Sequence, residues 1–259
     1  MDLLAPSHWR CVDLISDLHL QDADRNTFDA WAGYMRSTDA DAVFILGDLF
    51  EVWVGDDALQ PGTFEAECVH VLRAAGGRLA LYVMQGNRDF LMGPALMQAC
   101  LATALPDPSV LVFGGLRWLL SHGDALCTED HEYLAFRAQV RSSEWQRDFL
   151  AKPLSERQGI ARAIRNASEN RKQSLPVYAD VNAQAALQLL QDVHSKHLIH
   201  GHTHQPAQHQ LDAQCLRTVL SDWDMNAKPA RAEILRLKIN GPQANLARLP
   251  LASIARIAD

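Results

Sequence analysis

The chain has 259 residues, of which 48% are hydrophobic, so it can bury one large core or a core that carries an insertion. Its formal net charge of −7 argues against a protein that binds nucleic acid through bulk positive charge. The five cysteines lie far apart, which indicates reduced thiols in a cytoplasmic protein rather than a disulfide framework or a zinc ribbon. There is no secretory leader before the first expected strand and no apolar run approaching about 18 residues, so we expect neither export nor a membrane span.

Apolar runs and helical spacings alternate along the first half of the chain. A short apolar run bounded by turn residues is typical of a buried strand, and apolar residues three or four apart predict a helix. Gly76-Gly77 is a suitable end for the second expected helix, and Pro94 is a suitable start for the third. The patterns predict strands over 11–15, 42–46 and 79–84, helices over 24–37, 64–75 and 94–103, and a hairpin of 110–113 with 116–120.

The second half begins with a long helical stretch, 130–173, that contains no expected strand. Strands that alternate with helices and then follow one another predict an α/β fold with two mixed sheets between helices, a four-layer αββα sandwich. We therefore expect one domain, 1–259, with an inserted helical cap over 130–175. The remaining expected elements are a helix over 182–194, an apolar strand before His202, and short strands at 215–220, 232–237 and 245–249.

The sequence Leu-Ile-His-Gly-His-Thr-His-Gln-Pro at 198–206 combines a short apolar strand with two histidines placed one residue apart. Alternate side chains of an extended chain point the same way, so we expect His202 and His204 to face one point. Gly201 permits a sharp turn just before them. Converging imidazoles at a strand end provide half of a metal site, whereas the alternative is an ordinary histidine-rich surface loop.

Five loops each follow an expected apolar strand, and each carries at least one oxygen or nitrogen donor. Taken singly, these donors have ordinary alternatives: Asp17 can cap a helix, Asn87 can occupy a turn, and His122 can be a hydrogen-bonded core histidine. Their shared position directly behind five strands favours one metal site built from all five loops. The motifs, in chain order, are Asp17-x-His19, Gly47-Asp48, Gly86-Asn87, His122-Gly123 and Gly201-His202-x-His204.

In this order the motifs resemble those of the calcineurin-like metallophosphoesterases, and the resemblance extends over residues 17–204. It implies a four-layer α/β sandwich that holds two Mn²⁺-type ions. Carboxylate, amide and imidazole ligands suit Mn²⁺, iron or Zn²⁺, and the sequence does not choose among them. The implied ligands of the first ion are Asp17, His19, His204 and the shared Asp48, and those of the second are Asp48, Asn87, His122 and His202.

The chemistry expected of such a site follows from the two ions. Cations about 4 Å apart lower the pKa of a bridging water and neutralise charge on the phosphoryl oxygens. Hydroxide then attacks phosphorus in line, so no protein nucleophile is required. The sequence contains no convincing Ser-His-Asp or Cys-His arrangement, in agreement with this expectation.

Arg88 follows Asn87 at a position where most members of the family that the motifs resemble have histidine, a general acid for an alkoxide leaving group. An arginine gives up no proton near neutral pH, so a leaving group that needs no acid, such as the phosphate of a cleaved pyrophosphate, fits better. We expect Arg88 to be a catalytic residue that stabilises charge on the additional phosphoryl group. The alternative is a structural ion pair with Asp89 or Asp56.

Four longer stretches, 45–57, 86–91, 122–128 and 200–206, narrow the resemblance to the family members that hydrolyse UDP-2,3-diacylglucosamine. This resemblance implies Mn²⁺-dependent cleavage of the pyrophosphate bond to UMP and 2,3-diacylglucosamine 1-phosphate in lipid A biosynthesis. It implies a monomer bound peripherally to the cytoplasmic face of the inner membrane of a Gram-negative bacterium. Gln205 stands where this branch usually has arginine, which leaves the neighbouring substrate contacts open. The implied substrate contacts within the motifs are Asn87, Arg88 and His202.

Between residues 137 and 173 the chain has nine Lys or Arg and four Asp or Glu, an excess of five positive charges on an acidic protein. Apolar residues near helical spacing accompany them, so a cationic cap could bind a diphosphate on one side and acyl chains or an anionic membrane on the other. The alternative is an ordinary helix pair with one apolar and one solvated face. By their position in the cap of the family that the chain resembles, Ser168, Lys172 and Asp130 are candidate substrate contacts.

Two other classes of function stay open at this point. Another hydrolase of the same fold, such as a phosphodiesterase or a protein phosphatase, would have the same metal site, but Arg88 and the cap argue against it. A non-catalytic scaffold would be expected to lack ligands, whereas all seven are present. A substrate panel separates the first class, and metal analysis of the purified protein separates the second.

Overall fold

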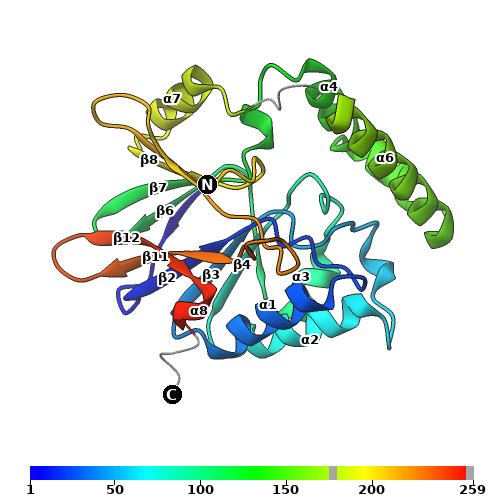
Figure 1. Cartoon of the computed structure of the whole chain (residues 1–259), viewed down its shortest axis with the longest axis horizontal. Helices are drawn as coiled ribbons and strands as arrows, with labels where there is room; N and C mark the ends of the chain where they lie inside the picture. The colour runs from blue at the N-terminus through cyan, green and yellow to red at the C-terminus, as the bar shows by residue number, and fades with distance from the viewer. Residues whose placement is uncertain (175–179, 255–259) are drawn as a thin grey trace.

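The computed structural model describes the backbone of residues 1–174 and 180–254, and the side chains of those residues except 166–174 and 254. Within these ranges the chain forms two six-stranded mixed sheets that lie face to face, with helices on their outer faces (Figure 1). The four-layer α/β sandwich predicted from the sequence is confirmed.

The two sheets are named after one of their central strands. The β2 sheet has the strand order β12-β11-β2-β3-β4-β5, and its strands β2 to β5 are parallel neighbours. Its strands are β2 (Cys11–Ile15), β3 (Ala42–Leu46), β4 (Ala80–Met84), β5 (Thr103–Leu105), β11 (Glu233–Ile239) and β12 (Ala244–Pro250). The β7 sheet has the order β1-β6-β7-β8-β10-β9, and β8 runs parallel to both β7 and β10. Its strands are β1 (Asp2–Leu4), β6 (Ser109–Phe113), β7 (Leu116–Ser121), β8 (His197–His200), β9 (Gln208–Gln210) and β10 (Leu216–Val219).

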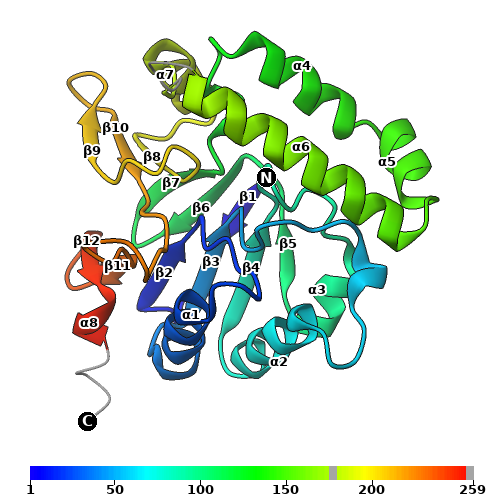
Figure 2. The same cartoon turned by 45° about the vertical axis from the view of Figure 1, so that its right-hand side comes forward.

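Helices cover the outer face of each sheet. Three of them pack on the β2 sheet, and one packs on the β7 sheet (Figures 1 and 2). On the β2 sheet these are α1 (Arg25–Ser37), α2 (Phe64–Gly76) and α3 (Pro94–Cys100), and on the β7 sheet it is α7 (Ala183–Asp192). Two single-turn 3₁₀ helices, Asp56–Ala58 and Asp124–Leu126, and the short α8 (Leu251–Ile254) complete these elements.

Local sequence explains where the helices begin and end. Asp24 caps α1 by accepting a hydrogen bond from the backbone N–H of Thr27 at 3.1 Å, and Pro94 opens α3 as predicted. The third helix stops at Cys100, earlier than predicted, because Leu101 adopts a left-handed conformation with φ of 57°. The chain then enters β5, one of three short strands, with β1 and β9, that the sequence does not predict. Each has only three residues, too few to show a period.

Alternate apolar side chains of the facing strands fill the space between the sheets. Phe44 of the β2 sheet and Trp118 and Ile199 of the β7 sheet belong to this central core, and each is at most 2% exposed. The intervening Ile15 and Ile45 pack on the other side of the β2 sheet, beneath the helices. Because both faces of the central strands are covered, their sequences are largely apolar runs, and this is why the sequence predicts them. The exception in β2 is the buried Asp13, which pairs with Arg236.

Three consecutive helices, here called the cap helices, lie apart from the sandwich helices (Figure 2). They are α4 (His131–Val140), α5 (Ser143–Leu150) and α6 (Leu154–Ser174), and they account for the helical stretch predicted after residue 130. Phe149 is buried against the core, whereas Leu150 and Ile164 are exposed. Among the helices within the described ranges, none has the length and hydropathy needed to cross a bilayer.

Arg157 fastens the base of α6 to the sandwich. This charged residue is only 1% exposed, and its guanidinium forms an ion pair with Asp57. It also donates hydrogen bonds to the backbone oxygens of Val54 and Lys152. A buried guanidinium needs such partners, because an unpaired charge in this position would be strongly destabilising.

We expect Arg157→Met to loosen the cap helices while the sandwich stays folded. Methionine retains much of the apolar stem but removes hydrogen bonds from a charged donor, each worth about 1.5–3 kcal/mol. Limited proteolysis followed by mass spectrometry should therefore detect faster cleavage between residues 137 and 165 than in the wild type. Arg147→Met is the matched control, since Arg147 is exposed and pairs only with its neighbour Asp148 on the surface of α5. Equal cleavage rates in the wild type and Arg157→Met would contradict the anchoring role.

Candidate active site

The predicted donor residues follow the carboxyl ends of β2, β3, β4, β7 and β8. The first three strands are parallel neighbours in one sheet and the last two in the other, so their loops emerge at one edge of each sheet. Hydrogen bonds join the two edges, because the carboxylate of Asp17 accepts from the backbone N–H of His202 at 2.9 and 3.1 Å. Asp17, in the first predicted motif, and His202, in the last, are therefore neighbours.

Asp17, His19 and His204 form the first group of facing donors. Nε2 of His204 lies 3.2 Å from Nε2 of His19 and 3.3 Å from Oδ1 of Asp17. One donor atom from each residue lies within 4.8 Å of the other two. Two imidazole nitrogens and a carboxylate oxygen this close together form a suitable donor set for a divalent transition-metal ion.

Asn87, His122 and His202 form the second group. Oδ1 of Asn87 lies 2.9 Å from Nε2 of His122 and 2.9 Å from Nδ1 of His202. Nδ1 of His122 lies 2.9 Å from the backbone oxygen of Leu46, so the ring donates there and its Nε2 faces the group. The backbone of β3 therefore orients this side chain.

Asp48 and Asp17 lie between the two groups. Oδ1 of Asp48 is 3.7 Å from Nε2 of His122, and its Oδ2 is 4.0 Å from Nδ1 of His19. Asp17, Asp48 and His122 also bring one donor atom each within 4.8 Å of one another. The structure thus gathers all seven predicted donors, with two carboxylates rather than one in the intermediate position.

The expectation that His202 and His204 face one point is wrong. Their φ angles are 69° and 53°, so the backbone is not extended and the alternation of side chains along a strand does not apply. The backbone N–H of Thr203 donates to the oxygen of Gly201 at 2.8 Å, which closes a tight turn. As a result, His202 joins the second group and His204 joins the first.

Two glycines permit the loops to approach this closely. A Cβ atom at Gly86 would collide with the carboxylate of Asp48, and a Cβ atom at Gly201 would collide with the side chains of Asp17 and Ser16. The glycines before Asn87 and His202 are therefore required by space. This explains why a glycine precedes the donor in both motifs.

The site holds more negative charge than its buried position favours. Asp17 and Asp48 are at most 1% exposed. Burial raises the pKa of Asp48, and the charge of Asp17 raises it further. Burial and then the charge of Asp48 raise the pKa of Asp89 to about 7. Burial alone would lower the pKa of His122, but the carboxylates around it raise this pKa to about 9. Divalent cations between these carboxylates would relieve their mutual repulsion.

A second observation also indicates that the donor set fits a divalent metal ion. Nδ1 of His19 is buried and makes no hydrogen bond to any residue within the described ranges. A buried polar atom without a partner is costly, and one that faces carboxylates is a natural metal ligand. The negative charge of the site, the types of its donor atoms and this unpaired nitrogen all favour a site for a divalent metal ion.

Arg88 projects beside the donors, but neither predicted ion-pair partner holds it. Its guanidinium pairs with Glu51, and its Nε lies 3.5 Å from Oδ2 of Asp48. Asp89 instead accepts from the backbone N–H groups of the loops around it, including Gly86 at 2.7 Å and Leu49 at 2.8 Å. Arg88 therefore does form an ion pair, but the predicted partners Asp89 and Asp56 are wrong.

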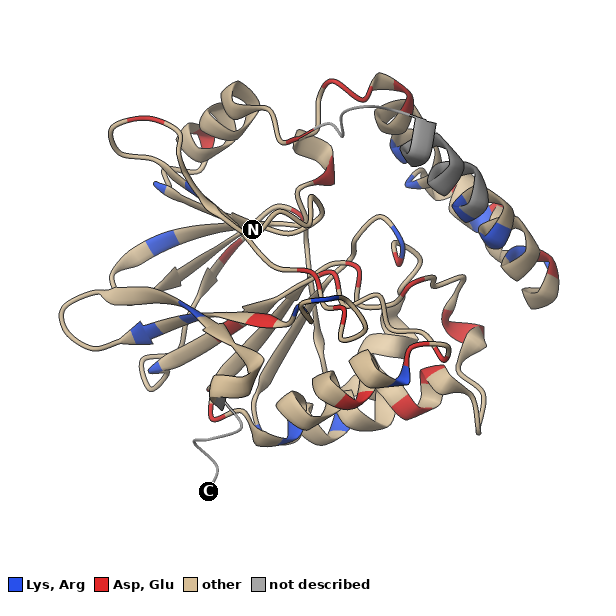
Figure 3. Ribbon diagram, viewed as in Figure 1, with Lys and Arg blue, Asp and Glu red and all other residues tan. Residues whose placement is uncertain are grey.

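Glu51 is a residue of the site that the sequence reasoning missed. Its carboxylate pairs with Arg88 on one side and with Arg165 of α6 on the other, and it lies 3.7 Å from Nδ1 of His19. Figure 3 shows acidic residues on the loops of the sandwich and Lys and Arg along α6. The one available signal was the position of Glu51 three residues after Asp48 in a motif that was already noted.

Asp124 joins the loop of His122 to α4. Its Oδ2 accepts hydrogen bonds from the hydroxyl of Tyr133 at 2.5 Å and from Nε of Arg137 at 2.7 Å. Asp130, a predicted substrate contact, caps α4 by accepting from the backbone N–H of Tyr133 at 3.0 Å. Ser168 and Lys172, the other two predicted cap contacts, have side chains that lie outside the described residues.

Asp222, another residue that the sequence reasoning missed, approaches the first group from the loop after β10. Its Oδ2 lies 3.8 Å from Nδ1 of His204, and Arg231 holds the carboxylate with hydrogen bonds of 2.7 to 3.1 Å. A carboxylate on the far nitrogen of a metal-binding imidazole helps to orient the ring. No sequence motif predicted a role for this residue, because it lies beyond the last expected donor in the chain.

Comparisons with known proteins agree with this geometry. A family model described as calcineurin-like phosphoesterase matches residues 12–206. A UDP-2,3-diacylglucosamine hydrolase of Chromobacterium violaceum is 45% identical over 221 residues, which cover 82% of this chain and 90% of that protein. One of the same name from Bordetella pertussis is 40% identical, covering 89% of this chain and 92% of its own length. The chain therefore belongs to the calcineurin-like phosphoesterase family of metal-dependent hydrolases.

Proposed function

We propose that this enzyme hydrolyses the pyrophosphate bond of UDP-2,3-diacylglucosamine to UMP and 2,3-diacylglucosamine 1-phosphate, a step of lipid A biosynthesis. The observation that carries the proposal is the similarity to hydrolases of that name over more than four fifths of the chain, combined with Arg88 beside the donor groups. The enzyme would act with two Mn²⁺ ions per chain. Between them, the ions would supply a hydroxide nucleophile at neutral pH and neutralise charge on the phosphoryl oxygens.

The two donor groups divide the ligands between the two ions. Asn87 and His202, which face each other in the second group, remain our candidates for additional substrate contacts. Asp48 would be shared, in keeping with its position between His19 and His122. Asp17 lies close to both groups and is a second bridging candidate. The ligands proposed for the first ion are Asp17, His19, Asp48 and His204, and those for the second are Asp48, Asn87, His122 and His202.

Arg88 selects the leaving group. A permanently charged guanidinium stabilises a departing phosphate, which needs no proton at neutral pH. Glu51 pairs with Arg88 and thus compensates its charge. A diphosphate that enters the site would compete with Glu51 for both Arg88 and Arg165. The same reasoning makes another phosphodiesterase or phosphatase the second candidate, since it would use the metal groups but gain little from Arg88.

The cap, residues 130–175, would close over the lipid half of the substrate. Phe136, Leu150 and Ile164, one from each cap helix, are between 37% and 41% exposed and supply apolar surface. Arginines on α6 supply positive charge for a diphosphate or an anionic membrane surface. Asp130, Ser168 and Lys172 remain our candidates for substrate contacts in this layer. We propose a monomer that binds peripherally to the cytoplasmic face of the inner membrane.

The direct test is a Mn²⁺-dependent assay on UDP-2,3-diacylglucosamine that scores UMP release. The proposed function predicts faster turnover of this substrate than of a simple aryl phosphodiester, since only the former presents a second phosphoryl group to Arg88. Faster turnover of the aryl phosphodiester would favour the second candidate. Absence of UMP release with Mn²⁺ present would rule out the pyrophosphatase.

Metal removal should both inactivate and destabilise the protein. A chelator would leave the buried carboxylates of Asp17 and Asp48 close together without the positive charge of the ions. Ligands that bind only the folded state stabilise it by about 2.7 kcal/mol at 100 times their dissociation constant. Differential scanning calorimetry of the metal-free protein should therefore show a Tm that rises on titration with Mn²⁺, more than with Ca²⁺, since imidazole ligands favour transition metals. A Tm that does not respond to Mn²⁺ would contradict the metal assignment.

A further inference from the structure

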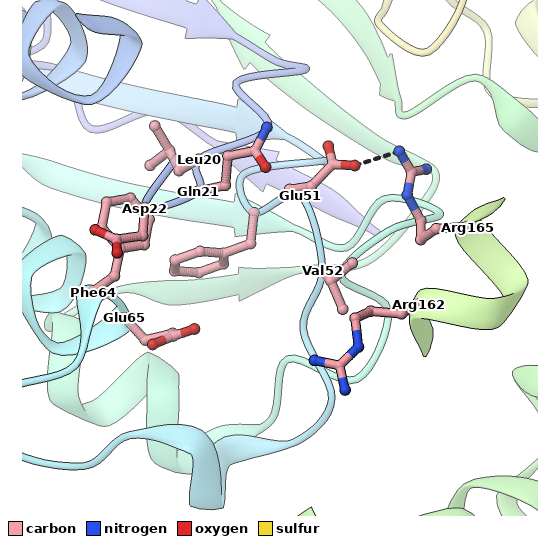
Figure 4. Close-up of a pocket in the computed structure, with 10 residues that line it drawn as sticks. Leu20, Gln21, Asp22, Glu51, Val52, Phe64, Glu65, Arg162 and Arg165 are labelled. Atoms are coloured by element: carbon pink, nitrogen blue, oxygen red, sulfur yellow. Dashed lines mark hydrogen bonds and ion pairs between the residues drawn. The ribbon is translucent and has the colours of Figure 1, made fainter. Parts of the chain in front are cut away.

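A pocket of about 370 Å³ adjoins the donor groups between the sandwich and α6 (Figure 4). Glu51 forms part of its wall, and the same carboxylate lies 3.7 Å from Nδ1 of His19. Leu20 and Gln21, which directly follow His19 in the chain, line it as well. The pocket thus lies next to the first donor group. Its volume falls in the range of about 300–1,000 Å³ that is typical of small-molecule sites.

One side of the pocket combines an aromatic side chain with hydrogen-bonding groups. The ring of Phe64 lines it, and the guanidinium carbon of Arg25 and the ring centroid of Phe28 lie 5.0 and 5.3 Å from the centroid of that ring. The side chains of Gln21 and Glu65 also line the pocket (Figure 4). An amide has both donors and an acceptor, so Gln21 matches a partner that presents both along one edge. The carboxylate of Glu65 accepts hydrogen bonds only, as vicinal hydroxyl groups would require.

The opposite side is cationic. Arg162 and Arg165, one turn apart on α6, border the pocket across from Gln21 (Figure 4). Arg165 pairs with Glu51, which in turn pairs with Arg88 beside the metal donors. Guanidinium groups bind phosphate oxygens through paired hydrogen bonds. A phosphate chain could therefore run from the metal donors past Arg165, with its organic group in the pocket.

This lining does not suit an acyl chain. Six of the ten lining residues are polar or charged, and a methylene chain would remove them from water without giving them partners. Aromatic side chains suited to a lipid lie elsewhere: Phe90, Trp145 and Phe149 form a contiguous cluster where α5 meets the core, with ring centroids 4.6 to 6.1 Å apart. None of these three lines the pocket. The two halves of an amphiphilic nucleotide substrate would therefore separate to different sides of the cap.

We propose that this pocket binds the nucleoside half of the substrate, a pyrimidine with its ribose. The base would pack beside Phe64, whose ring already contacts Arg25 and Phe28, and would pair its imide edge with the amide of Gln21. The ribose hydroxyls would donate to Glu65. The assignment rests on the proposed pyrophosphatase function, in which UMP is a product. It goes further by naming the residues that recognise the nucleoside rather than the phosphates.

Calorimetric titration in Mn²⁺ buffer tests the pocket without relying on catalysis. UMP is compared with ribose 5-phosphate, which has the same phosphate and the same 2- and 3-hydroxyls but a hydroxyl in place of the base. We expect UMP to bind the wild type at least about tenfold more tightly. In Gln21→Ala the Kd of UMP should rise about tenfold, as expected for one lost hydrogen-bonded contact, and that of ribose 5-phosphate should not change. Gln98→Ala, on the exposed face of α3, is the matched control and should bind both as the wild type does.

A second variant and a parallel assay make the outcomes separable. Glu65→Ala should weaken UMP more than deoxyuridine 5′-monophosphate, which lacks one ribose hydroxyl. Equal binding of UMP and ribose 5-phosphate to the wild type, or unchanged UMP binding in Gln21→Ala, would overturn the nucleoside pocket. If the wild type still releases UMP from the lipid substrate in that case, the proposed function stands and only the pocket assignment falls. If no UMP is released, the function falls and takes this assignment with it.

Discussion

Replacement of Asp48 by alanine is expected to lower kcat by at least about 10³-fold while the chain stays folded. Asp48 is the carboxylate that approaches His19 of the first group and His122 of the second, at 4.0 and 3.7 Å. Its loss would weaken both proposed metal sites at once. Burial and the charge of Asp17 raise the pKa of Asp48, so its charged form is less favourable in the folded state than in the unfolded chain. Removing it should leave the metal-free protein no less stable than the wild type.

Two measurements separate the catalytic effect from misfolding. Steady-state kinetics should show the loss of turnover, and calorimetry should show an unchanged or higher Tm without metal but a smaller rise on addition of Mn²⁺. Asp29→Ala, an exposed aspartate on α1, is the control for loss of one negative charge. Turnover by Asp48→Ala within a few fold of the wild type would refute the shared-ligand role. Asp17→Ala provides a comparison, because Asp17 lies in both donor clusters.

Arg88→Ala is expected to lower kcat/KM for the pyrophosphate substrate by the equivalent of about 2–4 kcal/mol of transition-state stabilisation. The guanidinium lies 3.5 Å from Asp48, so it stands at the edge of the metal site where a departing phosphate would carry charge. An aryl phosphodiester has no second phosphoryl group, and its hydrolysis should fall much less. The ratio of the two effects is the measurement, since a change in folding would lower both equally.

Three further variants sharpen the test of Arg88. Arg88→Lys retains the charge but loses the paired geometry of the guanidinium, so its activity should lie between those of the wild type and Arg88→Ala. Glu51→Gln should cost less than Arg88→Ala, because Glu51 pairs with the arginine and not with the substrate. Arg36→Ala, on the exposed surface of α1, is the charge-matched control. An equal loss on both substrates in Arg88→Ala would contradict a role in selecting the leaving group.

Glu51 connects the cap helices to the sandwich. Its carboxylate pairs with Arg165 of α6 and with Arg88 of the sandwich, so it links the cap to the loop that carries Arg88. Arg157 makes a separate, buried connection at the base of the same helix. A phosphate that displaces Glu51 would therefore exchange one bridge between cap and sandwich for another, while the anchor at Arg157 is unaffected.

The fold and the list of candidate metal donors could be predicted from the sequence because both depend on short-range patterns. A central strand such as β3 is buried on both faces and is therefore a continuous apolar run. Each donor follows its strand directly, and a glycine precedes Asn87 and His202 where loops come too close for a Cβ atom. The role expected of Arg88 follows from the identity of its side chain alone, since arginine keeps its proton near neutral pH.

Other features were decided only by the tertiary structure, because they depend on how distant segments meet. The left-handed backbone at His202 and His204 sends the two rings to different groups, and the hydrogen bond from His202 to Asp17, far away in the chain, positions this turn against the other sheet. Likewise, Glu51 acquires its role from Arg165 on a helix 114 positions later. Sequence spacing thus determined which residues are available for the chemistry, whereas sheet pairing and helix packing determined which of them face one another.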